Sequence, residues 1–414
     1  MKIVRVEAHL LSFPFPEPIE LSYHGGDRRI VKRDAMLIRV GCSNGLVGYA
    51  PGSATEAVRD LITSTIGPFL VGQTLADPDA MRVRFNSRPG AESEAGPGAA
   101  RAYTMVEVAL YDLVGKQRGV PVSELLGGRV RDRIRLYASA GMYQPPESYA
   151  EEAQAMQELK FTAYKMRPGL GPGQDVRAVE LMRRATGPSF DLMVDAHTWW
   201  RMGDHSYSEP TVIELAGQMA EHAIFWLEEP LLPDRHDAYA RLKAAATVPI
   251  AGGEHEPGEA GFLDLIHQGC VDYVQLDLLC QGGYGLARRV FAEVARQNLR
   301  FAFHSWGTDL ELMAAAQLGV CWPEDVVEWL EYPVYTTPTV KSMYRFDLAR
   351  GILRTPLDIE HGELMVNRQP GLGVDVDESV ITRYPWIPGP WSYFSLHSPA
   401  ETFAVVGDHS IKFA

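Results

Sequence analysis

Short apolar runs alternate with longer segments of helical periodicity through the middle of the chain. The runs begin 24 to 32 residues apart and are expected to be strands: Ile134–Ala138, Thr162–Met166, Leu192–Val194, Ile224–Leu227, Val248–Ala251, Tyr273–Leu276, Phe301–Phe303 and Val326–Leu330. Strands that alternate with helical segments indicate βαβ units and a parallel sheet. Eight such units over about 200 residues predict an α/β fold of the (β/α)8 barrel type.

The chain before this region has a different pattern. Two strand-like runs, Ile3–Phe13 and Ala35–Gly41, are followed by helical periodicity from about Ala54. The Gly25-Gly26 pair between the runs is typical of a turn, and predicts either a plain hairpin tip or a loop over an active site. We therefore expect a separate α+β domain over residues 1–128, before a barrel over residues 129–349.

The chain after the last predicted strand is irregular and rich in proline. Short strand-like pieces occur around Ile352 and at Leu364–Val366. Residues 386–414 are aromatic and proline-rich, and we expect them to form a tail packed on the surface of the protein rather than a helix or a linker. This tail is also a candidate oligomer interface.

Composition narrows the class of protein. The 414 residues carry 39 Lys and Arg against 53 Asp and Glu, a formal net charge of −14. Nucleic acids and anionic membranes bind cationic surfaces, so neither is an expected partner. The N-terminal residues lack the apolar stretch of a signal peptide, and the four cysteines have no CxxC spacing. We expect a cytoplasmic protein.

Ionisable side chains follow seven consecutive predicted strands. In a barrel of this kind such residues converge at the mouth formed by the carboxyl ends of the strands. Each has an ordinary explanation on its own, such as a helix cap or a surface ion pair. Together they would be costly unless a cation or a substrate balanced their charge. In chain order they are Lys165 and Arg167, Asp195 and His197, Glu228 and Glu229, Glu254 with His255 and Glu256, Asp277, His304, and Glu331.

Two groups among these residues suggest a reaction. Asp195, Glu228 and Glu254 are hard oxygen ligands from adjacent strands, and with water they suit octahedral Mg²⁺. Asp277 and His304 suit a dyad in which the carboxylate orients the imidazole and raises its basicity. A cation that stabilises negative charge beside a base that removes a proton is an arrangement for abstracting a proton next to a carboxylate.

Several short motifs occur along nearly the whole chain. They are Ala109-Leu110-Tyr111-Asp112 with Gly119-Val120-Pro121, Leu125-Leu126-Gly127-Gly128, Trp226-Leu227-Glu228-Glu229-Pro230, Gly253-Glu254, Gly282-Gly283, His304-Ser305, and Pro370-Gly371-Leu372-Gly373. With these motifs the chain resembles the enolase superfamily, specifically its mandelate racemase-like subgroup of acid-sugar dehydratases and racemases, whose members use a Lys or His base with Mg²⁺.

The resemblance implies a modified (β/α)7β barrel and a capping domain over residues 1–128 that is completed by about residues 350–385. It implies that Asp195, Glu228 and Glu254 bind one Mg²⁺ per subunit and that Asp277 and His304 form the catalytic dyad. It also implies that Glu331 hydrogen-bonds the carboxylate of the substrate, and that the protein is a homo-oligomer.

One departure from the family pattern bears on the reaction. The racemases carry a Lys-x-Lys motif whose second lysine is a base opposite the histidine, whereas this chain has Lys165-Met166-Arg167. A guanidinium is not a useful base, although it can bind a carboxylate or a hydroxyl group. A two-base racemase would then need Lys165 as its second base, whereas elimination by His304 alone would survive. The departure favours dehydration.

Five further residues are candidates for binding or proton transfer. His197 forms an Asp-x-His motif with Asp195, similar to that of galactonate- and mannonate-dehydratase-like members, where the histidine is the general acid; it could instead form a hydrogen bond to substrate, with His304 returning its own proton. His255 is expected to contact metal-bound water or substrate. His24, Arg28 and Tyr49 lie on two segments of the capping domain that cover the substrate in this family.

We therefore predict an Mg²⁺-dependent dehydratase that converts a small-molecule acid sugar, an aldonate or an aldarate, into a 2-keto-3-deoxy acid. The alternatives are a racemase or epimerase of a 2-hydroxy acid and, from a different class of protein, a catalytically silent barrel that binds a metal or a sugar acid.

Overall fold

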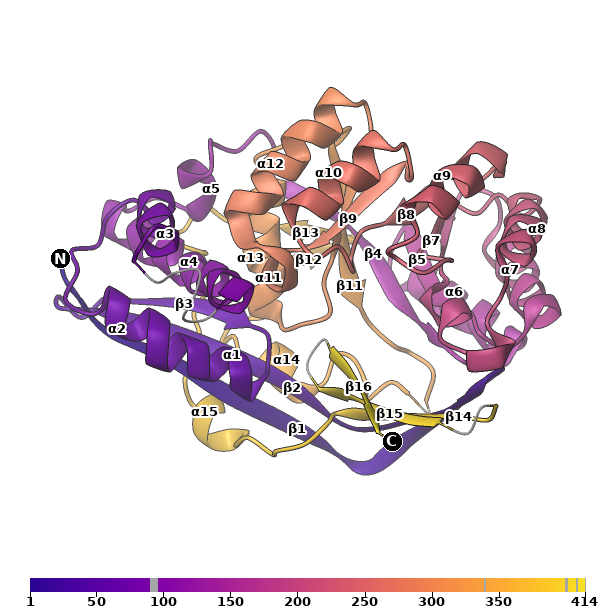
Figure 1. Cartoon of the computed structure of the whole chain (residues 1–414), viewed down its shortest axis with the longest axis horizontal. Helices are drawn as coiled ribbons and strands as arrows, with labels where there is room; N and C mark the ends of the chain where they lie inside the picture. The colour runs from indigo at the N-terminus through magenta and orange to yellow at the C-terminus, as the bar shows by residue number, and fades with distance from the viewer. Residues whose placement is uncertain (90–95, 339, 399–400, 407–408, 414) are drawn as a thin grey trace.

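The computed structural model describes residues 1–89, 96–338, 340–398, 401–406 and 409–413. Two bodies lie against each other: a barrel, and a capping domain built on a long antiparallel sheet (Figure 1). No helix in the described part of the chain combines the length and the apolar character needed to cross a membrane.

The capping domain begins with a hairpin of unusual length. Its first strand spans 21 residues and pairs with the second across the turn at Tyr23 and Gly26, so the strand-like runs of the sequence extend much further than predicted. The helices that follow pack against the hairpin, and Asp77 caps one of them by accepting from Ala80 N. The elements are β1 (Ile3–Tyr23), β2 (Gly26–Cys42), β3 (Val47–Gly52), α1 (Glu56–Leu61), the π-helix η1 (Ile62–Ile66), α2 (Gly67–Leu70), α3 (Pro78–Asn86), α4 (Gly96–Arg118) and α5 (Val122–Leu125).

Eight parallel strands of the described chain close into the barrel, because the last of them, β11, pairs with the first, β4. All eight predicted strands are present, with ends shifted by a few residues. They are β4 (Arg133–Met142), β5 (Ala163–Arg167), β6 (Asp191–Asp195), β7 (Trp226–Glu228), β8 (Ile250–Gly252), β9 (Tyr273–Asp277), β10 (Arg300–His304) and β11 (Val327–Pro333).

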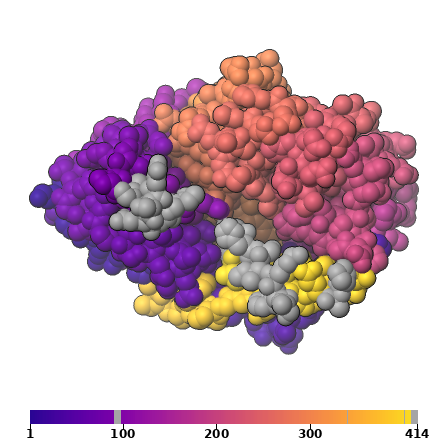
Figure 2. Space-filling view, viewed as in Figure 1, coloured from indigo at the N-terminus to yellow at the C-terminus, as the bar shows by residue number. Residues whose placement is uncertain are grey.

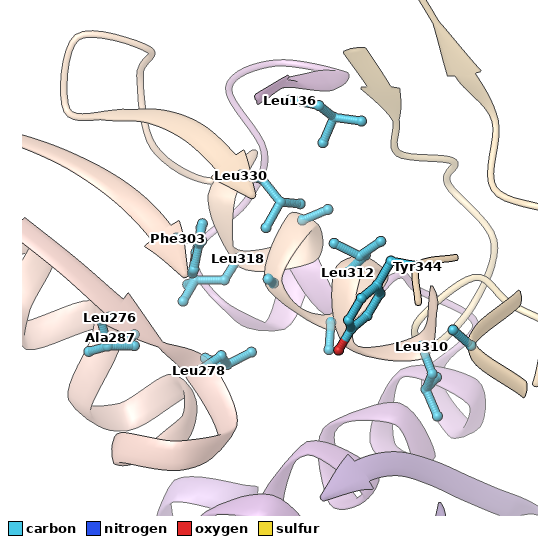
Figure 3. Close-up of a cluster of buried hydrophobic side chains, with 14 of the residues drawn as sticks. Leu136, Leu276, Leu278, Ala287, Phe303, Leu310, Leu312, Leu318, Leu330 and Tyr344 are labelled. Atoms are coloured by element: carbon cyan, nitrogen blue, oxygen red, sulfur yellow. The ribbon is translucent and has the colours of Figure 1, made fainter. Parts of the chain in front are cut away.

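Helices connect the barrel strands and cover the outside of the barrel. They pack on the outward-facing strand residues, such as Leu276, Phe303 and Leu330, which meet the apolar faces of α12 and α13 in a continuous buried cluster (Figure 3). The helices are α6 (Pro146–Glu158), α7 (Pro172–Thr186), the 3₁₀-helices η2 (His197–Trp200) and η3 (Gly203–His205), α8 (Glu209–Ala220), α9 (His236–Ala245), α10 (Glu259–His267), α11 (Leu278–Gln281), α12 (Gly283–Arg296) and α13 (Asp309–Gly319).

The chain after the barrel returns to both bodies. A short hairpin pairs with β4, and the last strands join the capping sheet in the order β1-β2-β14-β15-β16. The elements are α14 (Asp347–Gly351), β12 (Ile359–Glu360), β13 (Glu363–Met365), α15 (Val380–Arg383), β14 (Ser392–Leu396), β15 (Glu401–Val406) and β16 (His409–Phe413). The predicted division is corrected in part: the described residues after 386 are not a separate tail, because strands β14–β16 join the capping sheet. Residues 350–385 also contact the capping domain, since Leu11 pairs with Pro385 and Val122 N donates to Gly371 O.

This C-terminal sheet extension lies beside the barrel. The capping hairpin and strands β14–β16 run beneath the barrel (Figure 1), and the space-filling view shows the C-terminal strands in yellow between the indigo capping domain and the magenta part of the barrel (Figure 2). Strand β2 is the shared element, since its second edge pairs with β14 over Gly26–Ile30 and with β3 over Met36–Gly41.

Candidate active site

The interior of the barrel changes from apolar to charged within two residues along five of its eight described strands. One layer consists of side chains from all eight strands: Tyr137, Ala163, Met193, Trp226, Ala251, Tyr273, Ala302 and Trp329. Successive side chains of a strand alternate between faces, so the next inward-facing residue lies two positions further on. These positions carry Lys165, Asp195, Glu228, His304 and Glu331. The alternation brings together the charged residues that the sequence places at the strand ends.

Lys165 lies at the centre of a buried ionic network. Its side chain has no exposed surface, and its Nζ lies 2.6 Å from Glu228 Oε1, 3.0 Å from Glu331 Oε1 and 3.5 Å from Asp195 Oδ2. Burial favours the neutral amine, but the neighbouring carboxylates outweigh burial and raise the pKa of Lys165 well above its ordinary value. Lys165 is therefore a charge-balancing cation enclosed among carboxylates.

Arg167 lies two residues after Lys165 on β5, closer to the mouth of the barrel. Its Nε is 2.9 Å from Asp195 Oδ2, its Nη2 is 3.5 Å from Glu331 Oε1, and its guanidinium stacks 3.9 Å from the ring of Trp306. Its Nη1 donates to no described residue. This nitrogen is the part of Arg167 that remains available to a substrate.

Asp277 and His304 form a hydrogen-bonded pair at the ends of β9 and β10. Asp277 Oδ2 lies 2.9 Å from His304 Nδ1, while Oδ1 accepts from the backbone N–H groups of Leu279 and Cys280 at the start of α11. The helix cap fixes the carboxylate, and the carboxylate fixes the ring. Because Nδ1 is engaged, Nε2 is the ring nitrogen left for chemistry.

The surroundings of His304 are strongly anionic. Its Nε2 lies 3.3 Å from Glu254 Oε2 and 3.8 Å from Glu331 Oε2. Burial lowers the pKa of His304, but Glu254, Glu331 and Asp277 together raise it well above the ordinary value for histidine.

Of the predicted metal ligands, Asp195 and Glu228 are buried and Glu254 is half-buried, and together they carry an excess of negative charge. Burial, with a contribution from Asp195 and Glu254, raises the pKa of Glu228 to about 8 despite the contact with Lys165. Glu254 Oε2 accepts no hydrogen bond from any described residue. A divalent cation would relieve both conditions, so the donor set of Asp195, Glu228 and Glu254 fits Mg²⁺ in charge and in ligand type.

A second set of ligand atoms overlaps the first. Within the described ranges, one trio of potential ligand atoms lies within 4.8 Å of one another, and it consists of Glu229, Glu254 and His255. His255 Nδ1 lies 2.5 Å from Glu229 Oε2, and Arg201 Nη2 lies 2.8 Å from His255 Nε2. Glu254 therefore belongs to both sets: it is one of the three predicted Mg²⁺ ligands, and it also lies close to Glu229 and His255.

His197 lies beside Asp195 on the loop after β6. Its Nδ1 is 2.7 Å from Asp195 Oδ1. Burial lowers the pKa of His197 to about 4, against the opposing effect of Asp195. The contact with Asp195 leaves His197 Nε2 as the second ring nitrogen with access to the cavity.

A cavity of about 630 Å³ lies between the barrel and the capping domain. Residues from the barrel form its floor: Arg167, His197, Glu254, His255, Asp277 and His304. Residues from the capping sheet and its C-terminal extension form its roof: Arg28, Arg33, Trp391 and Phe394. Lys165, Asp195, Glu228 and Glu331 are fully buried and do not line the cavity, and we count them with the floor because Arg167 and His304 contact members of this buried set.

Two of the residues expected to bind substrate do not line this cavity. His24 is exposed at the tip of the β1–β2 hairpin, where its ring packs 4.9 Å from that of His205. Tyr49 donates to Glu378 Oε1 at 2.6 Å on the other side of the capping domain. Arg28 and His255 are in the cavity as expected.

Several cavity residues were not among the predicted site residues, and Arg33, Trp306, Trp391 and Phe394 are four of them. Arg28 and Arg33 are five positions apart, so simple alternation would put them on opposite faces of β2, yet both are buried. The pairing of β1 with β2 is irregular between Pro14 and Ile19, opposite the stretch of β2 that separates the two arginines. Such an irregularity twists a strand and cannot be read from one sequence.

Comparisons with known proteins agree with this architecture. Residues 6–127 match the mandelate racemase/muconate lactonizing enzyme N-terminal domain, and residues 148–380 match the enolase C-terminal domain-like family. The chain is 28% identical over 393 residues to a D-galactarolactone cycloisomerase of Agrobacterium fabrum, covering 93% of this chain and 99% of that protein. It is 26% identical over 365 residues to a D-xylonate dehydratase of Haloferax volcanii, covering 83% of each.

A crystal structure of an enolase superfamily member from Polaromonas sp. JS666 has the same fold, with a TM-score of 0.80 at 30% sequence identity. The match covers 94% of this chain and 99% of that one. The superposition therefore includes both the capping domain and the barrel.

Proposed function

The chain belongs to the mandelate racemase/muconate lactonizing enzyme family of the enolase superfamily, and from this premise we propose that it is an Mg²⁺-dependent dehydratase of an acid sugar. The observation that carries the proposal is the Asp277–His304 dyad, which lines the same cavity as Arg167. The relatives named as acid-sugar dehydratases support the substrate class.

The proposed reaction begins at His304. Its Nε2 takes the proton from the carbon next to the substrate carboxylate, and the C–H electron pair moves into that carboxylate as an enediolate. The electron pair then returns as the C–O bond to the neighbouring hydroxyl group breaks. The hydroxide takes up a proton and leaves as water, and the enol that remains becomes the 2-keto-3-deoxy acid.

Asp195, Glu228 and Glu254 would hold the Mg²⁺. Bound there, the cation would supply electrostatic stabilisation of the negative charge that develops on the carboxylate oxygens. Arg167 would add to this charge balance through Nη1, which donates to no described residue.

His197 is the proposed acid for the leaving hydroxyl group. It lines the cavity on the side of the floor occupied by Glu254 and His255, and its Nδ1 is held by Asp195. If His197 only binds substrate, His304 must return the proton that it has taken. Replacing His197 with Asn separates these two cases, because dehydration then persists only if His304 acts alone.

The arrangement argues against the racemase alternative. A two-base racemase needs a base on each face of the substrate carbon. Position 167 is an arginine, and Lys165 is enclosed by three carboxylates in the layer below the cavity lining. Elimination needs one base, and His304 provides it.

The test is proton NMR of sugar acids incubated with the protein and Mg²⁺ in D₂O. Dehydration would produce a C3 methylene group that carries deuterium, whereas loss of the α-proton signal with every hydroxyl group retained would indicate exchange or epimerisation. The panel should include aldarolactones, because one relative is a D-galactarolactone cycloisomerase and a ring oxygen can leave as a hydroxyl group does. The control is His304→Asn, which should convert far less of any substrate than the wild type over the same incubation.

A further inference from the structure

Two arginines in the roof of the cavity are buried although neither forms an ion pair with a carboxylate of the described chain. Arg28 and Arg33 of β2 are 6% and 4% exposed. No described carboxylate lies within 4 Å of either guanidinium, unlike Arg39 of the same strand, which pairs with Glu7 and Glu378. Buried charges in proteins are normally paired, so these two side chains call for an anion from elsewhere.

Aromatic rings surround the two guanidinium groups. Arg28 lies 5.0 Å from the ring of Trp391 and 4.6 Å from that of Phe394, and its Nε donates to Ser392 Oγ at 3.0 Å. These three partners belong to the C-terminal extension, while Arg28 Nη1 donates to Met142 Sδ of the barrel strand β4 at 3.1 Å. Stacking orients a guanidinium and leaves its edge N–H groups for an anion in the ring plane, but it does not cancel the positive charge.

Arg33 is held in the same way and has unused donors. Its guanidinium lies 4.4 Å from the ring of Trp391, 4.7 Å from Tyr344 and 5.6 Å from Trp306. Its Nε and Nη2 are buried and donate to no described residue. Burial lowers the pKa of both arginines, that of Arg28 to about 10. A guanidinium group remains charged at neutral pH.

The roof is connected to the floor through one ring. Trp306 stacks on Arg167 at 3.9 Å on one side and lies within 5.6 Å of Arg33 on the other, and its Nε1 donates to Glu331. The two arginines of the roof and the residues of the proposed reaction therefore line one continuous cavity.

We propose that Arg28 and Arg33 bind a second anionic group at the far end of the substrate, so that the substrate is an acid sugar with a carboxylate at each end, an aldarate. This inference rests on the proposed function for the chemistry at the first carboxylate. Two guanidinium groups that share Trp391 can each donate to one terminal carboxylate, whereas the hydroxymethyl end of an aldonate would leave both charges buried and unpaired.

The test compares kcat/KM for matched pairs of sugar acids, galactarate against galactonate and glucarate against gluconate. The wild-type protein should prefer the di-acid in the pair whose configuration it accepts. Arg33→Gln should lower kcat/KM for the di-acid by about 10- to 100-fold, mainly through KM, because it removes charge-assisted hydrogen bonds to the distal carboxylate. Arg33→Lys keeps the charge without the fork of donors and should give a smaller loss.

Arg29→Gln is the matched control. Arg29 is the neighbour of Arg28 on β2, but its side chain is 57% exposed and pairs with Glu20 on the outside of the sheet. This variant should keep the wild-type preference. If it loses the preference as Arg33→Gln does, a general effect of charge on the capping domain explains the data and the subsite is overturned.

Binding of adipate, an unreactive six-carbon dicarboxylate, separates failure of this inference from failure of the proposed function. Calorimetry should show weaker adipate binding to Arg33→Gln and Arg33→Lys than to the wild type, even if no sugar acid is turned over. Equal adipate binding, or equal kcat/KM for mono- and di-acids, would overturn the subsite while leaving the dehydratase intact. A preference for 6-phosphogluconate over glucarate would support an anion site there but overturn the aldarate assignment.

Discussion

The positively charged side chains have different neighbours at the floor and at the roof of the cavity: carboxylates at the floor and aromatic rings at the roof. At the floor, Lys165 and Arg167 contact Asp195, Glu228 and Glu331 at 2.6 to 3.5 Å. At the roof, Arg28 and Arg33 contact aromatic rings at 4.4 to 5.6 Å and no described carboxylate. At the floor, carboxylates outnumber cationic side chains, so a bound cation would balance the charge. At the roof, the arginines have no carboxylate partner among the described residues, so a bound anion would balance the charge.

The two regions also differ in how the chain builds them. The charged floor residues that lie on strands, such as Lys165, Asp195 and His304, are fixed by the alternation of their own strands, whereas His197, Glu254 and His255 follow a strand end. The roof combines residues 28–33 with residues 391–394, which are more than 350 positions apart in sequence and meet because β14 pairs with β2. The proposed catalytic residues are therefore positioned by their own strands and the segments that directly follow them. The proposed binding site for the far end of the substrate forms only when β14 pairs with β2.

The largest expected effect comes from removing the cation that the floor calls for. Dialysis against EDTA should reduce dehydration below detection, and Mg²⁺ should restore it, because the charge that develops on the substrate carboxylate would lose its main counterion. Turnover in D₂O monitored by NMR measures this directly. Full activity after chelation, verified by elemental analysis of the protein, would refute the metal site.

Replacing the base should have the next largest effect. His304→Asn should lower kcat by about 10²- to 10⁴-fold, because a positioned general base contributes a factor of this size. Adipate binding should change little, since the roof is intact. Asp277→Asn is the companion variant, and it should retain more activity than His304→Asn because the imidazole is still present but less well oriented.

The strands that form the floor, and the charged residues at their ends, could be predicted from the sequence alone. The eight apolar runs predict the barrel strands to within a few residues, and residues such as Asp195 and Glu228 stand at the strand ends because alternation places them there. The barrel and its capping domain were thus predictable. The roles of these side chains remain predictions, since proximity in the structure does not by itself assign a reaction.

The arrangement of the roof could not be predicted from the sequence. The aromatic tail gave no sign that it would form strands against β2, and nothing local predicted that Arg33 would share a cavity with His304. Strand pairing over such a separation depends on the tertiary structure, and the irregular pairing near Pro14 alters the orientation of residues on β2. The candidate ligand Arg28 was found by its loop position, whereas its partner Trp391 was not.

The junction between the two regions should respond to pH through Asp175. This buried carboxylate accepts from Gly169 N, Leu170 N, Trp199 Nε1 and Tyr207 Oη, and the capping hairpin rests on the same loop because His24 N donates to Gly169 O. Burial raises the pKa of Asp175 from 3.8 to about 6 in spite of these hydrogen bonds.

Since the folded state holds the Asp175 proton more tightly than the unfolded chain, the stability that this proton provides is present at low pH and is lost as pH rises through about 6. The free energy of unfolding of the wild type, relative to that of Asp175→Asn, should therefore fall by on the order of 2–3 kcal/mol between pH 4 and pH 7. Urea denaturation of both proteins across this range measures the difference. A difference that does not vary with pH would contradict the raised pKa.

Trp391→Leu should produce a smaller effect confined to the roof. Loss of the ring shared by Arg28 and Arg33 should lower kcat/KM for the preferred di-acid by about 3- to 30-fold, the range expected for a desolvated cation–π contact. The mono-acid should be affected less. Trp386→Leu is the control, because Trp386 stacks on Lys32 at 4.3 Å and does not line the cavity.

The smallest effects are expected at the two residues that family resemblance assigns to substrate and that the structure places elsewhere. Tyr49→Phe removes the hydrogen bond to Glu378, and His24→Ala removes a ring that packs on His205, yet neither side chain lines the cavity. Each variant should keep kcat/KM within about twofold of the wild type for both mono- and di-acids, while Tyr49→Phe should lose roughly 0.5–1.5 kcal/mol of unfolding free energy. If His24→Ala instead raised KM for the di-acid, the hairpin tip would have to reach the substrate during turnover. The roof of the cavity would then include the hairpin tip near Gly25 and Gly26 as well as Arg28. In that case one part of the roof would have to move during turnover, whereas the floor would stay in place.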